Sequence, residues 1–346
     1  MIPEAYQGER EEFRHDAIDG NILVDSTLDI VVHSLRSNRC SFMLLDTEAA
    51  ELRVGKARGL NADTVSNAHP KLGESIAGLV AIRRQPLLIH DIKDHPELRL
   101  RAIGGCRTDS LMSVPILVGD EVFGVLNITD RIDDQPFDEH DLETLNLLAR
   151  HLALCIENSL LQAQIQHLAN TDGLTGVYNH RYFQERLQEE IERASRFGKF
   201  VSLMMLDVNE FKEFNDTYGH QAGDILLQEI AAIIKQRVRH FDLVSRYGGD
   251  EFTVTLPETD GNRAMEVAER IVRAIAAHRS PMHPQGLRGL TVSIGVSTYP
   301  SPAAHKHELI EQADKAMYAA KQEGRYRVRH WDDALPTQTH AFQVIK

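Results

Sequence analysis

The chain is poor in cysteine, and the few cysteines present do not form a recognisable pattern. Cys40, Cys106 and Cys155 lie far apart in 346 residues, without a Cys-x-x-Cys pair or a Cys/His cluster. Neither a disulfide framework nor a zinc site is therefore expected, and a reducing compartment fits. Each cysteine is more simply interpreted as a small buried apolar residue than as a redox switch.

Positive charge is also scarce. Lys and Arg number 38 against 51 Asp and Glu, which gives a formal net charge of −13 at pH 7. This balance disfavours a broad basic surface that follows a nucleic-acid backbone, although a small basic pocket for one phosphate group is compatible with it. We expect no nucleic-acid polymer as a partner.

Long hydrophobic runs are missing as well. No stretch approaches the roughly 18 apolar residues that cross a bilayer. Residues 1–16 are charged and lack an apolar segment with a small-residue cleavage site. We therefore expect a cytoplasmic protein without a signal peptide or membrane contact. With 42% hydrophobic and 26% charged residues, 346 residues should fold as two globular domains.

The first half alternates helical and strand-like patterns. Helical spacing of apolar residues covers 21–35 and 73–82. Strand-like runs cover 40–45, 51–60, 86–89 and 110–128, the last being a hairpin through Gly119-Asp120. These patterns predict an antiparallel sheet with helices packed against it.

The same order of elements, with Phe137-Asp138 leading into a long helix, resembles a GAF domain over about residues 16–158. Residues 1–15 would be an extension. The ligand of this domain stays unknown: cyclic-nucleotide-binding GAF domains often carry Asn-Lys, whereas here Asn127 is followed by Ile128. The residues that could suggest haem or metal lack ligand spacing and are interpreted as solvated loop residues: His90, His95 and Cys106.

A helix of about 30 residues is predicted to connect the halves over 138–170. Its first apolar seam consists of Leu142, Leu145, Ala149, Leu152 and Ile156, and the seam then shifts to Leu161, Ile165 and Leu168. The shift indicates either a stutter in a coiled coil or a helix whose first part packs on its own sheet while only the second part pairs with another chain. Both interpretations stay open.

A turn-rich segment, residues 170–176, breaks this helix before another begins near His180. We place the second domain at residues 171–332 and a tail at 333–346.

Two acidic positions in the second domain follow strand-like runs. The apolar run 200–206 ends at Asp207, and an alternating pattern over 243–256 predicts a hairpin with Asp250 and Glu251 at its tip. Taken alone, the first could be a turn or helix-cap residue and the hairpin acids could simply be solvated. Together, carboxylates on neighbouring strand ends suit Mg²⁺ and metal-assisted displacement at phosphorus.

Several motifs then resemble the GGDEF family of diguanylate cyclases. They are the string from Asp207 to Asp224, the segment Arg246 to Phe252 (RYGGDEF), DGLTGVYN at 172–179, the strand-like 291–296, and the last helix 313–321 with its exit at Gly324-Arg325. The resemblance covers about residues 170–330. It implies a palm-like βαββαβ domain with a central antiparallel sheet that condenses two GTP molecules into cyclic di-GMP.

The resemblance also implies roles for matching positions. The catalytic hairpin would comprise Gly248, Gly249, Asp250 and Glu251, with Asp250 helping to deprotonate the 3′-hydroxyl. The metal, Mg²⁺ or Mn²⁺, would be held by Asp207, Val208 through its carbonyl, Asp250 and Glu251. The substrate-binding positions would be Phe211, Lys212, Asn215, His220, Asp224, Lys321 and Arg325. An amide and a carboxylate suit guanine, and cations suit a triphosphate.

One position departs from the family, because Asn209 replaces a frequent Asp two residues after Asp207. We expect little effect, since the main ligands remain. An allosteric product site is implied by Arg239 and Asp242 just before the hairpin, completed by Arg270.

In the family, two GGDEF domains face each other, so a homodimer through the GAF-like domain, the linker helix and the catalytic domains is expected. Two alternatives stay open. One is a catalytically silent GGDEF module that binds GTP or cyclic di-GMP, and the other is an enzyme that makes a different cyclic dinucleotide. Retention of the signature acids favours the active cyclase.

Overall fold

The structure, a computed structural model, describes residues 22–61, 65, 69–99, 107–278, 291–322 and 328–334. The chain divides into two compact units, Met1–Ile165 and Gln166–Lys346. Within the described ranges, no helix is both long enough and apolar enough to cross a bilayer. The predicted fold class is confirmed, with an N-terminal antiparallel sheet and helices, a long helix, and a second sheet domain.

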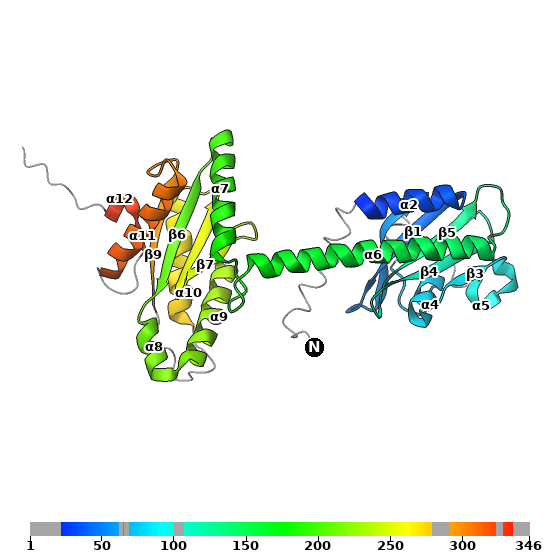
Figure 1. Cartoon of the computed structure of the whole chain (residues 1–346), viewed down its shortest axis with the longest axis horizontal. Helices are drawn as coiled ribbons and strands as arrows, with labels where there is room; N and C mark the ends of the chain where they lie inside the picture. The colour runs from blue at the N-terminus through cyan, green and yellow to red at the C-terminus, as the bar shows by residue number, and fades with distance from the viewer. Residues whose placement is uncertain are drawn as a thin grey trace, which may run out of the picture. The chain divides into compact units, whose positions relative to one another are not determined.

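A five-stranded sheet forms the centre of the N-terminal unit, in the order β2-β1-β5-β4-β3 (Figure 1). All neighbouring strands pair antiparallel. The strands are β1 (Ser37–Asp46), β2 (Glu51–Arg58), β3 (Leu87–Ile89), β4 (Leu111–Val118) and β5 (Glu121–Arg131). Gly119 and Asp120 join β4 to β5, as the Gly-Asp pair between two apolar runs predicts.

Helices cover both faces of this sheet. They are α2 (Ile22–Ser34), α4 (Ile76–Arg83), η2 (Ile92–Asp94), α5 (Pro96–Arg99) and α6 (Glu139–Asn170). Because side chains alternate along β1, Phe42 packs in the cluster with α2 and α6, whereas Met43 packs with α4 on the other face.

The first seam of α6 belongs to the core of this unit. Leu145, Ala149, Leu152 and Ile156 are buried in one cluster with Phe42 and its neighbours. The first part of the helix therefore packs on its own sheet, as the second interpretation expects. Pairing of the second part with another chain stays a prediction.

The expectation that each cysteine is a buried apolar residue is confirmed for Cys40 and not for Cys155. Cys40 is buried in the core, and burial raises the pKa of its thiol, which keeps it protonated. Cys155 is half-buried on α6, and Cys106 lies outside the described residues. His90 and His95 are exposed, as predicted.

The C-terminal unit has a second five-stranded sheet, in the order β10-β9-β6-β8-β7. Its strands are β6 (Val201–Val208), β7 (Leu243–Gly248), β8 (Glu251–Pro257), β9 (Val292–Tyr299) and β10 (Val328–His330). The β10–β9 pair is parallel and the other pairs are antiparallel. The sheet is therefore mixed, with the predicted antiparallel strands at its centre.

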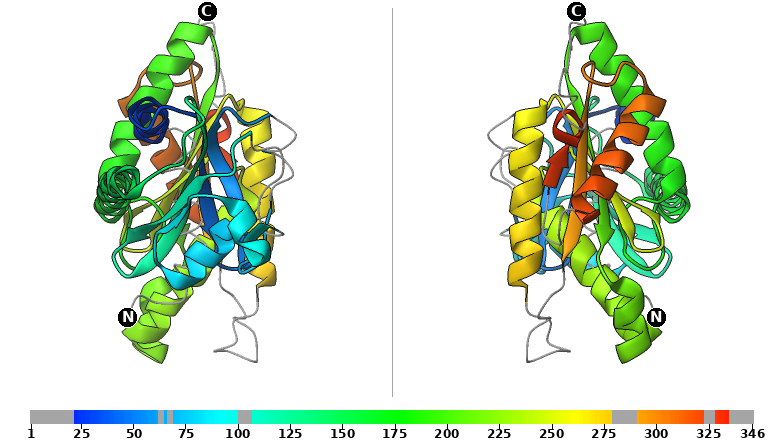
Figure 2. Two further views of the ribbon diagram at one scale, coloured as in Figure 1. Left: turned by 90° about the vertical axis from the view of Figure 1, so that its right-hand side faces the viewer. Right: turned by 90° about the vertical axis from the view of Figure 1, so that its left-hand side faces the viewer.

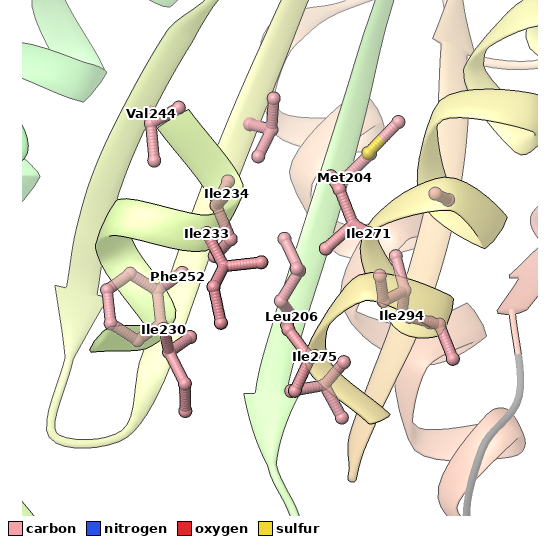
Figure 3. Close-up of a cluster of buried hydrophobic side chains, with 14 of the residues drawn as sticks. Met204, Leu206, Ile230, Ile233, Ile234, Val244, Phe252, Ile271, Ile275 and Ile294 are labelled. Carbon is pink, nitrogen blue, oxygen red and sulfur yellow. The ribbon is translucent and has the colours of Figure 1, made fainter. Parts of the chain in front are cut away.

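Helices sandwich this sheet (Figure 2). They are α7 (His180–Phe197), α9 (His220–Arg237), α10 (Gly261–Ala277), α11 (Lys306–Gln322) and α12 (Trp331–Ala334), while α8 (Phe211–Tyr218) lies beyond the end of β6 and contacts α9 (Figure 1). α9 and α10 cover one face around Phe252, as the close-up of the core shows (Figure 3). α7 and α11 cover the opposite face around Phe183.

Side chains along β6 alternate between the two faces of the sheet, and this determines the face on which Asp207 lies. Met204 and Leu206 pack with α9 and α10, so the residues between them face α7 and α11. Asp207 follows Met205 on that second face. The strand also continues to Val208, one residue further than the abrupt end of the apolar run predicted.

Candidate active site at the end of the central strands

The β7–β8 hairpin ends beside the end of β6. Gly249 and Asp250 form its turn, and Gly249 has the positive φ, 36°, that a glycine in this turn permits. The backbone N–H of Val208 donates to the carbonyl of Asp250 at 3.2 Å. In the β6–β8 register, Asp207 lies directly opposite Glu251. The structure thus brings together the three predicted acids.

Lys321, in the last turn of α11, completes this acidic edge. Its ammonium lies 2.7 Å from a carboxylate oxygen of Asp207. The lysine pairs with the predicted metal ligand in the structure. Its predicted role in holding a triphosphate stays a prediction.

Burial and mutual repulsion raise the pKa of two of the acids. For Asp207, burial raises the pKa most, Lys321 lowers it, and the charge of Asp250 raises it. For Glu251, burial again comes first, and the charges of Asp207, Asp250 and Asp314 raise its pKa further. Negative charge at this edge is therefore only partly compensated by the protein itself.

The chemistry of these donors fits a hard divalent cation. Carboxylate and carbonyl oxygens are the ligands that Mg²⁺ prefers, and repelling acids are relieved by a cation. Within the described residues, no three His, Cys, Asp or Glu side chains converge as a complete metal-binding group. Metal binding by Asp207, Val208, Asp250 and Glu251 therefore stays a prediction.

Arg246 supports the hairpin tip from one side. Its guanidinium donates from Nε and Nη2 to the carbonyl of Gly249, at 3.0 and 2.7 Å. Its Nη1 contacts both carboxylate oxygens of Asp172, at 3.1 and 3.3 Å. The pairing of β7 with β8 is irregular between Arg246 and Gly248. The Arg246 side chain supplies the hydrogen-bond donors for the carbonyl of Gly249, which lies in the turn beyond the paired residues.

The turn that contains Asp172 contacts both the end of α6 and strand β7. The Asp172 carboxylate accepts from the backbone N–H and the hydroxyl of Thr175, at 3.0 and 2.7 Å. Although burial opposes it, these bonds and Arg246 hold the pKa of Asp172 below its usual value. Asn179 donates to the carbonyl of Ala169 in α6, and Tyr178 donates to Val244 in β7.

The predicted guanine positions lie on α8 and α9, directly after β6. Asn215 is half-buried, and its Oδ1 has no hydrogen-bond partner among the described residues. A Cβ on Gly223 would lie 1.9 Å from this oxygen. Gly223 therefore provides the space in which the amide of Asn215 lies, and it immediately precedes Asp224.

The remaining predicted substrate residues differ in exposure. Lys212, His220 and Asp224 are exposed and open to a ligand. Phe211 packs against the core of the unit and so supports α8. Arg325 lies outside the described residues.

Asn209 joins the end of β6 to β9. Its Nδ2 donates to the hydroxyl of Thr291 at 2.7 Å, and its Oδ1 accepts from the hydroxyl of Ser293 at 3.0 Å. The amide thus uses both its donor and its acceptor, which an Asp at this position could not do.

The predicted product site is assembled beside β7. The backbone N–H of Arg239 donates to Asp242 at 2.7 Å, and the Arg239 guanidinium lies 5.6 Å from the centroid of the Phe241 ring. Burial raises the pKa of Asp242, while Arg239 and Arg270 lower it. Arg270 itself donates from Nε to the carbonyl of Arg237 at 3.1 Å. The charges of both arginines thus favour the ionised form of Asp242, while the Arg270 guanidinium hydrogen-bonds to the carbonyl of Arg237.

Comparisons with known proteins agree with this architecture. Residues 169–327 match the diguanylate cyclase GGDEF domain, and residues 19–157 match the GAF domain. The GGDEF domain of DgcB from Caulobacter crescentus, solved in complex with c-di-GMP, is 32% identical, and the match covers 47% of this chain and 96% of that one with a TM-score of 0.45.

The C-terminal half of the chain is a GGDEF domain. A GAF domain precedes the GGDEF domain. Diguanylate cyclase A of Treponema denticola is 36% identical over 227 residues, 64% of this chain and 60% of that protein. Response regulator PleD of Caulobacter vibrioides is 40% identical over 164 residues, 46% of this chain and 36% of PleD. The chain thus spans 60% or less of both curated relatives.

Two features of the GGDEF domain were not predicted from the sequence. The first is the contact between Asp172 and Arg246, 74 residues apart, although both lie in motifs that the sequence displays. The second is the close approach of Gly223 to Asn215. The sequence offered one signal for this contact, because Gly223 directly precedes Asp224, a predicted guanine-binding residue.

Proposed function

We propose that the chain is a diguanylate cyclase that converts two GTP into cyclic di-GMP and two diphosphates. The observation that carries this proposal is the acidic edge, where Asp207, Asp250 and Glu251 meet Lys321. All of these side chains belong to a GGDEF domain with its signature acids in place.

The reaction forms two phosphodiester bonds. Each 3′-hydroxyl oxygen would attack the α-phosphorus of the other GTP while the bond from that phosphorus to diphosphate breaks, and Asp250 would help to take up the hydroxyl proton. Asp207, Asp250, Glu251 and the Val208 carbonyl would hold a divalent cation, which would lower the pKa of the hydroxyl and offset the charge of the leaving oxygen. Positioning and electrostatics supply most of the rate acceleration, since no covalent intermediate with the protein is needed.

Other side chains would select and hold the nucleotide. Asp224 can accept from the N–H groups of guanine, and Asn215 offers a donor and an acceptor in a fixed place beside Gly223. Lys212 and Lys321 would offset the triphosphate charge. Adenine lacks the pair of N–H donors that suits a carboxylate, so guanine is the preferred base.

Two regulatory features accompany the reaction. Because each site holds one GTP, ring closure requires two GGDEF domains, and we propose a homodimer controlled by the GAF domain and α6. We also propose that cyclic di-GMP inhibits the enzyme by binding at Arg239, Asp242 and Arg270, where two arginines already act on one half-buried carboxylate.

A product assay tests the proposal. Purified full-length protein is incubated with GTP and Mg²⁺, and the products are separated and weighed by mass spectrometry. Cyclic di-GMP is expected from the wild type and from Glu185→Gln, which neutralises an exposed acid on α7. Asp250→Asn should reduce turnover by at least about a thousandfold, as loss of a metal ligand and acid-base group does.

The silent-module alternative has a different outcome. GTP would then bind the wild type, as shown by calorimetry, while no cyclic di-GMP forms. That result would overturn the proposed activity.

A further inference from the structure

Three hydroxyl groups are buried side by side in the GGDEF domain without a hydrogen-bond partner among the described residues. They belong to Ser245 and Thr253, which are both 0% exposed, and to Thr255, which is 1% exposed. Ser245 on β7 lies opposite Thr253 on β8 in the antiparallel register, and Thr255 is two residues further along β8. The hydroxyls thus form one group within the hairpin whose tip carries Asp250.

The three hydroxyl residues lie on the face of the sheet that α7 covers. Val244, Phe252 and Val254 pack with α9 and α10 on the opposite face, where Figure 3 labels the first two. Because side chains alternate along a strand, the residue that follows each of them points toward α7. α7 contacts both β7 and β8, and its buried Phe183 and Leu187 have no group that could bond a hydroxyl.

This face changes from large apolar side chains on β6 to small hydroxyl side chains on the hairpin. In the β6–β8 register, Leu203 lies opposite Thr255 and Met205 lies opposite Thr253. Leu203 and Met205 pack with α7 in one apolar cluster. Since serine and threonine are shorter than leucine and methionine, a helix that rests on β6 leaves space above the hairpin residues.

Buried hydroxyls without hydrogen bonds are costly. Each one that gives up its bonds to water without replacement lowers the folding equilibrium constant by roughly five- to a hundredfold. Three such groups in one place would remove a large share of the stability of an ordinary domain. Because the described protein atoms provide no partner, a small molecule that can both donate and accept is the remaining source of these bonds.

We propose that this face of the β7–β8 hairpin binds ordered water between the strands and α7. A water molecule has two donors and two acceptors, so it can bridge hydroxyls that each offer one donor and two acceptors. One molecule can contact Ser245 and Thr253, which face each other, and the same molecule or a second one can reach Thr255. The group holds no charged side chain and is fully buried, so water fits it better than an ion or a larger ligand.

Urea unfolding followed by the fluorescence of Trp331 tests the proposal. Trp331 is the single tryptophan of the chain and lies in the GGDEF domain, so it reports the unfolding of that domain. Thr253→Val and Thr255→Val each replace a hydroxyl by a methyl group of similar size. Each should raise the unfolding equilibrium constant about three- to tenfold, because a hydroxyl bonded to ordered water stabilises the fold as one bonded to protein does.

The opposite outcome is equally clear. If the hydroxyls have no partner, valine relieves the cost of burying them. Variants that are as stable as the wild type, or more stable, would therefore overturn the proposal.

A serine in the same sheet provides the matched control. Ser202 on β6 is also 0% exposed, but its hydroxyl donates to the carbonyl of Thr259 at 2.8 Å and lies 2.9 Å from the hydroxyl of Thr298. Ser202→Ala and Ser245→Ala are the same chemical change, and both should destabilise the GGDEF domain. If Ser202→Ala is less stable than the wild type while Ser245→Ala is more stable, Ser245 has no water partner and the proposal is wrong.

Oxygen-17 magnetic relaxation dispersion of the full-length protein detects the water itself, because it reports molecules that stay bound longer than the protein takes to rotate. The triple variant Ser245→Ala, Thr253→Val, Thr255→Val should lose part of the wild-type signal, and so should Thr253→Val alone. Circular dichroism verifies that each variant is folded. An unchanged dispersion signal in folded variants would reject the water site.

Discussion

Arg246 connects the turn after α6 to the tip of the catalytic hairpin. It donates twice to the carbonyl of Gly249 and contacts the carboxylate of Asp172. Asp250 follows Gly249 directly, so the position of the proposed catalytic acid depends on this guanidinium. Arg246 is thus a positioning residue, since it holds the hairpin and need not touch the nucleotide.

We expect Arg246→Lys to lower kcat about ten- to a hundredfold with KM for GTP changed less than about threefold, because small displacements of reacting groups slow catalysis strongly. A lysine cannot donate in the forked geometry of a guanidinium. Asp172→Asn should also lower kcat while leaving KM for GTP nearly unchanged. Steady-state kinetics of both variants and of the double variant would measure this.

The double variant is expected to be no slower than the worse single variant, because the residues act through one contact. Lys235→Gln is the control, since Lys235 donates to the carbonyl of Gly176 in the same turn at 3.3 Å. Additive losses in the double variant would show that the two residues act separately.

Gly223 lies where any side chain would displace Asn215. We expect Gly223→Ala to raise KM for GTP at least about tenfold and to reduce the preference for GTP over ATP, because the added Cβ would lie 1.9 Å from the Asn215 oxygen. Kinetics with both nucleotides measure the effect. Gly173→Ala is a matched control, since its Cβ would meet no heavy atom of the described residues within 4 Å. Unchanged selectivity in Gly223→Ala would contradict the role of this space.

Glu251 destabilises the folded protein when no cation is bound. Its folded-state pKa is raised, so the unfolded state ionises first as pH rises and the stability falls through this interval. Glu251→Gln should therefore stabilise the metal-free protein at neutral pH, by less than about 1 kcal/mol after solvent screening.

The gain in unfolding free energy of Glu251→Gln should be absent well below pH 4.5, the ordinary pKa of Glu. It should reach its full value above the raised pKa of Glu251 in the folded protein. Urea unfolding at a series of pH values, with chelator present, measures it. A gain that is largest in acid would contradict the sign of this linkage.

Contacts between side chains that lie far apart in the sequence were the hardest feature of the site to predict. The acids of the hairpin and Asp207 were predicted because each follows a recognisable strand pattern. The pairing of Lys321 with Asp207 was not, because it depends on how α11 packs against β6. The bond from Arg246 to Asp172 likewise requires two turns to meet in space.

At the scale of elements, strands and helices were predicted well where hydrophobic periodicity was strong. The hairpin β4–β5 turned where Gly119 and Asp120 indicated. The seam of α6 was ambiguous because the helix carries apolar residues on two faces, one that includes Leu145 and one that includes Leu147. Periodicity alone does not say which of these faces packs on the sheet. Burial of Leu145 and exposure of Leu147 resolve the question.

The two faces of α6 should respond differently to truncation. Leu145→Ala removes fully buried methyl groups and should cost about 2–5 kcal/mol of unfolding free energy at any protein concentration. Leu147→Ala should destabilise only through association, so its effect should diminish on dilution. Urea unfolding over a hundredfold range of concentration measures both. A concentration-independent loss in Leu147→Ala would place that residue in an intramolecular core.

At the scale of the whole molecule, the product site lies on a different part of the GGDEF domain from the acidic edge. Arg239 and Asp242 precede β7, while Arg270 on α10 hydrogen-bonds to the carbonyl of Arg237 and favours the charged form of Asp242. A ligand that bridges these residues would link separate elements of the domain. The proposed inhibition would therefore not require the product to occupy the substrate site.

We expect Arg239→Ala to raise the concentration of cyclic di-GMP that halves activity by at least about tenfold, with the initial rate unchanged, because a charge-assisted contact to the product is lost. Initial rates at increasing product concentration measure this. Arg273→Ala is the control, as its side chain pairs with Glu269 on the same helix. Equal inhibition of Arg239→Ala and the wild type would exclude this site.

The Lys321–Asp207 ion pair gives the acidic edge one counter-ion of its own. One ammonium lies among several carboxylates there, so the edge keeps a net negative charge. An ammonium has three N–H donors, so Lys321 could contact Asp207 and a phosphate oxygen at the same time. The lysine would then act as a bridge between an incoming nucleotide and the strand end, while the surplus charge of the acids stays available to a cation.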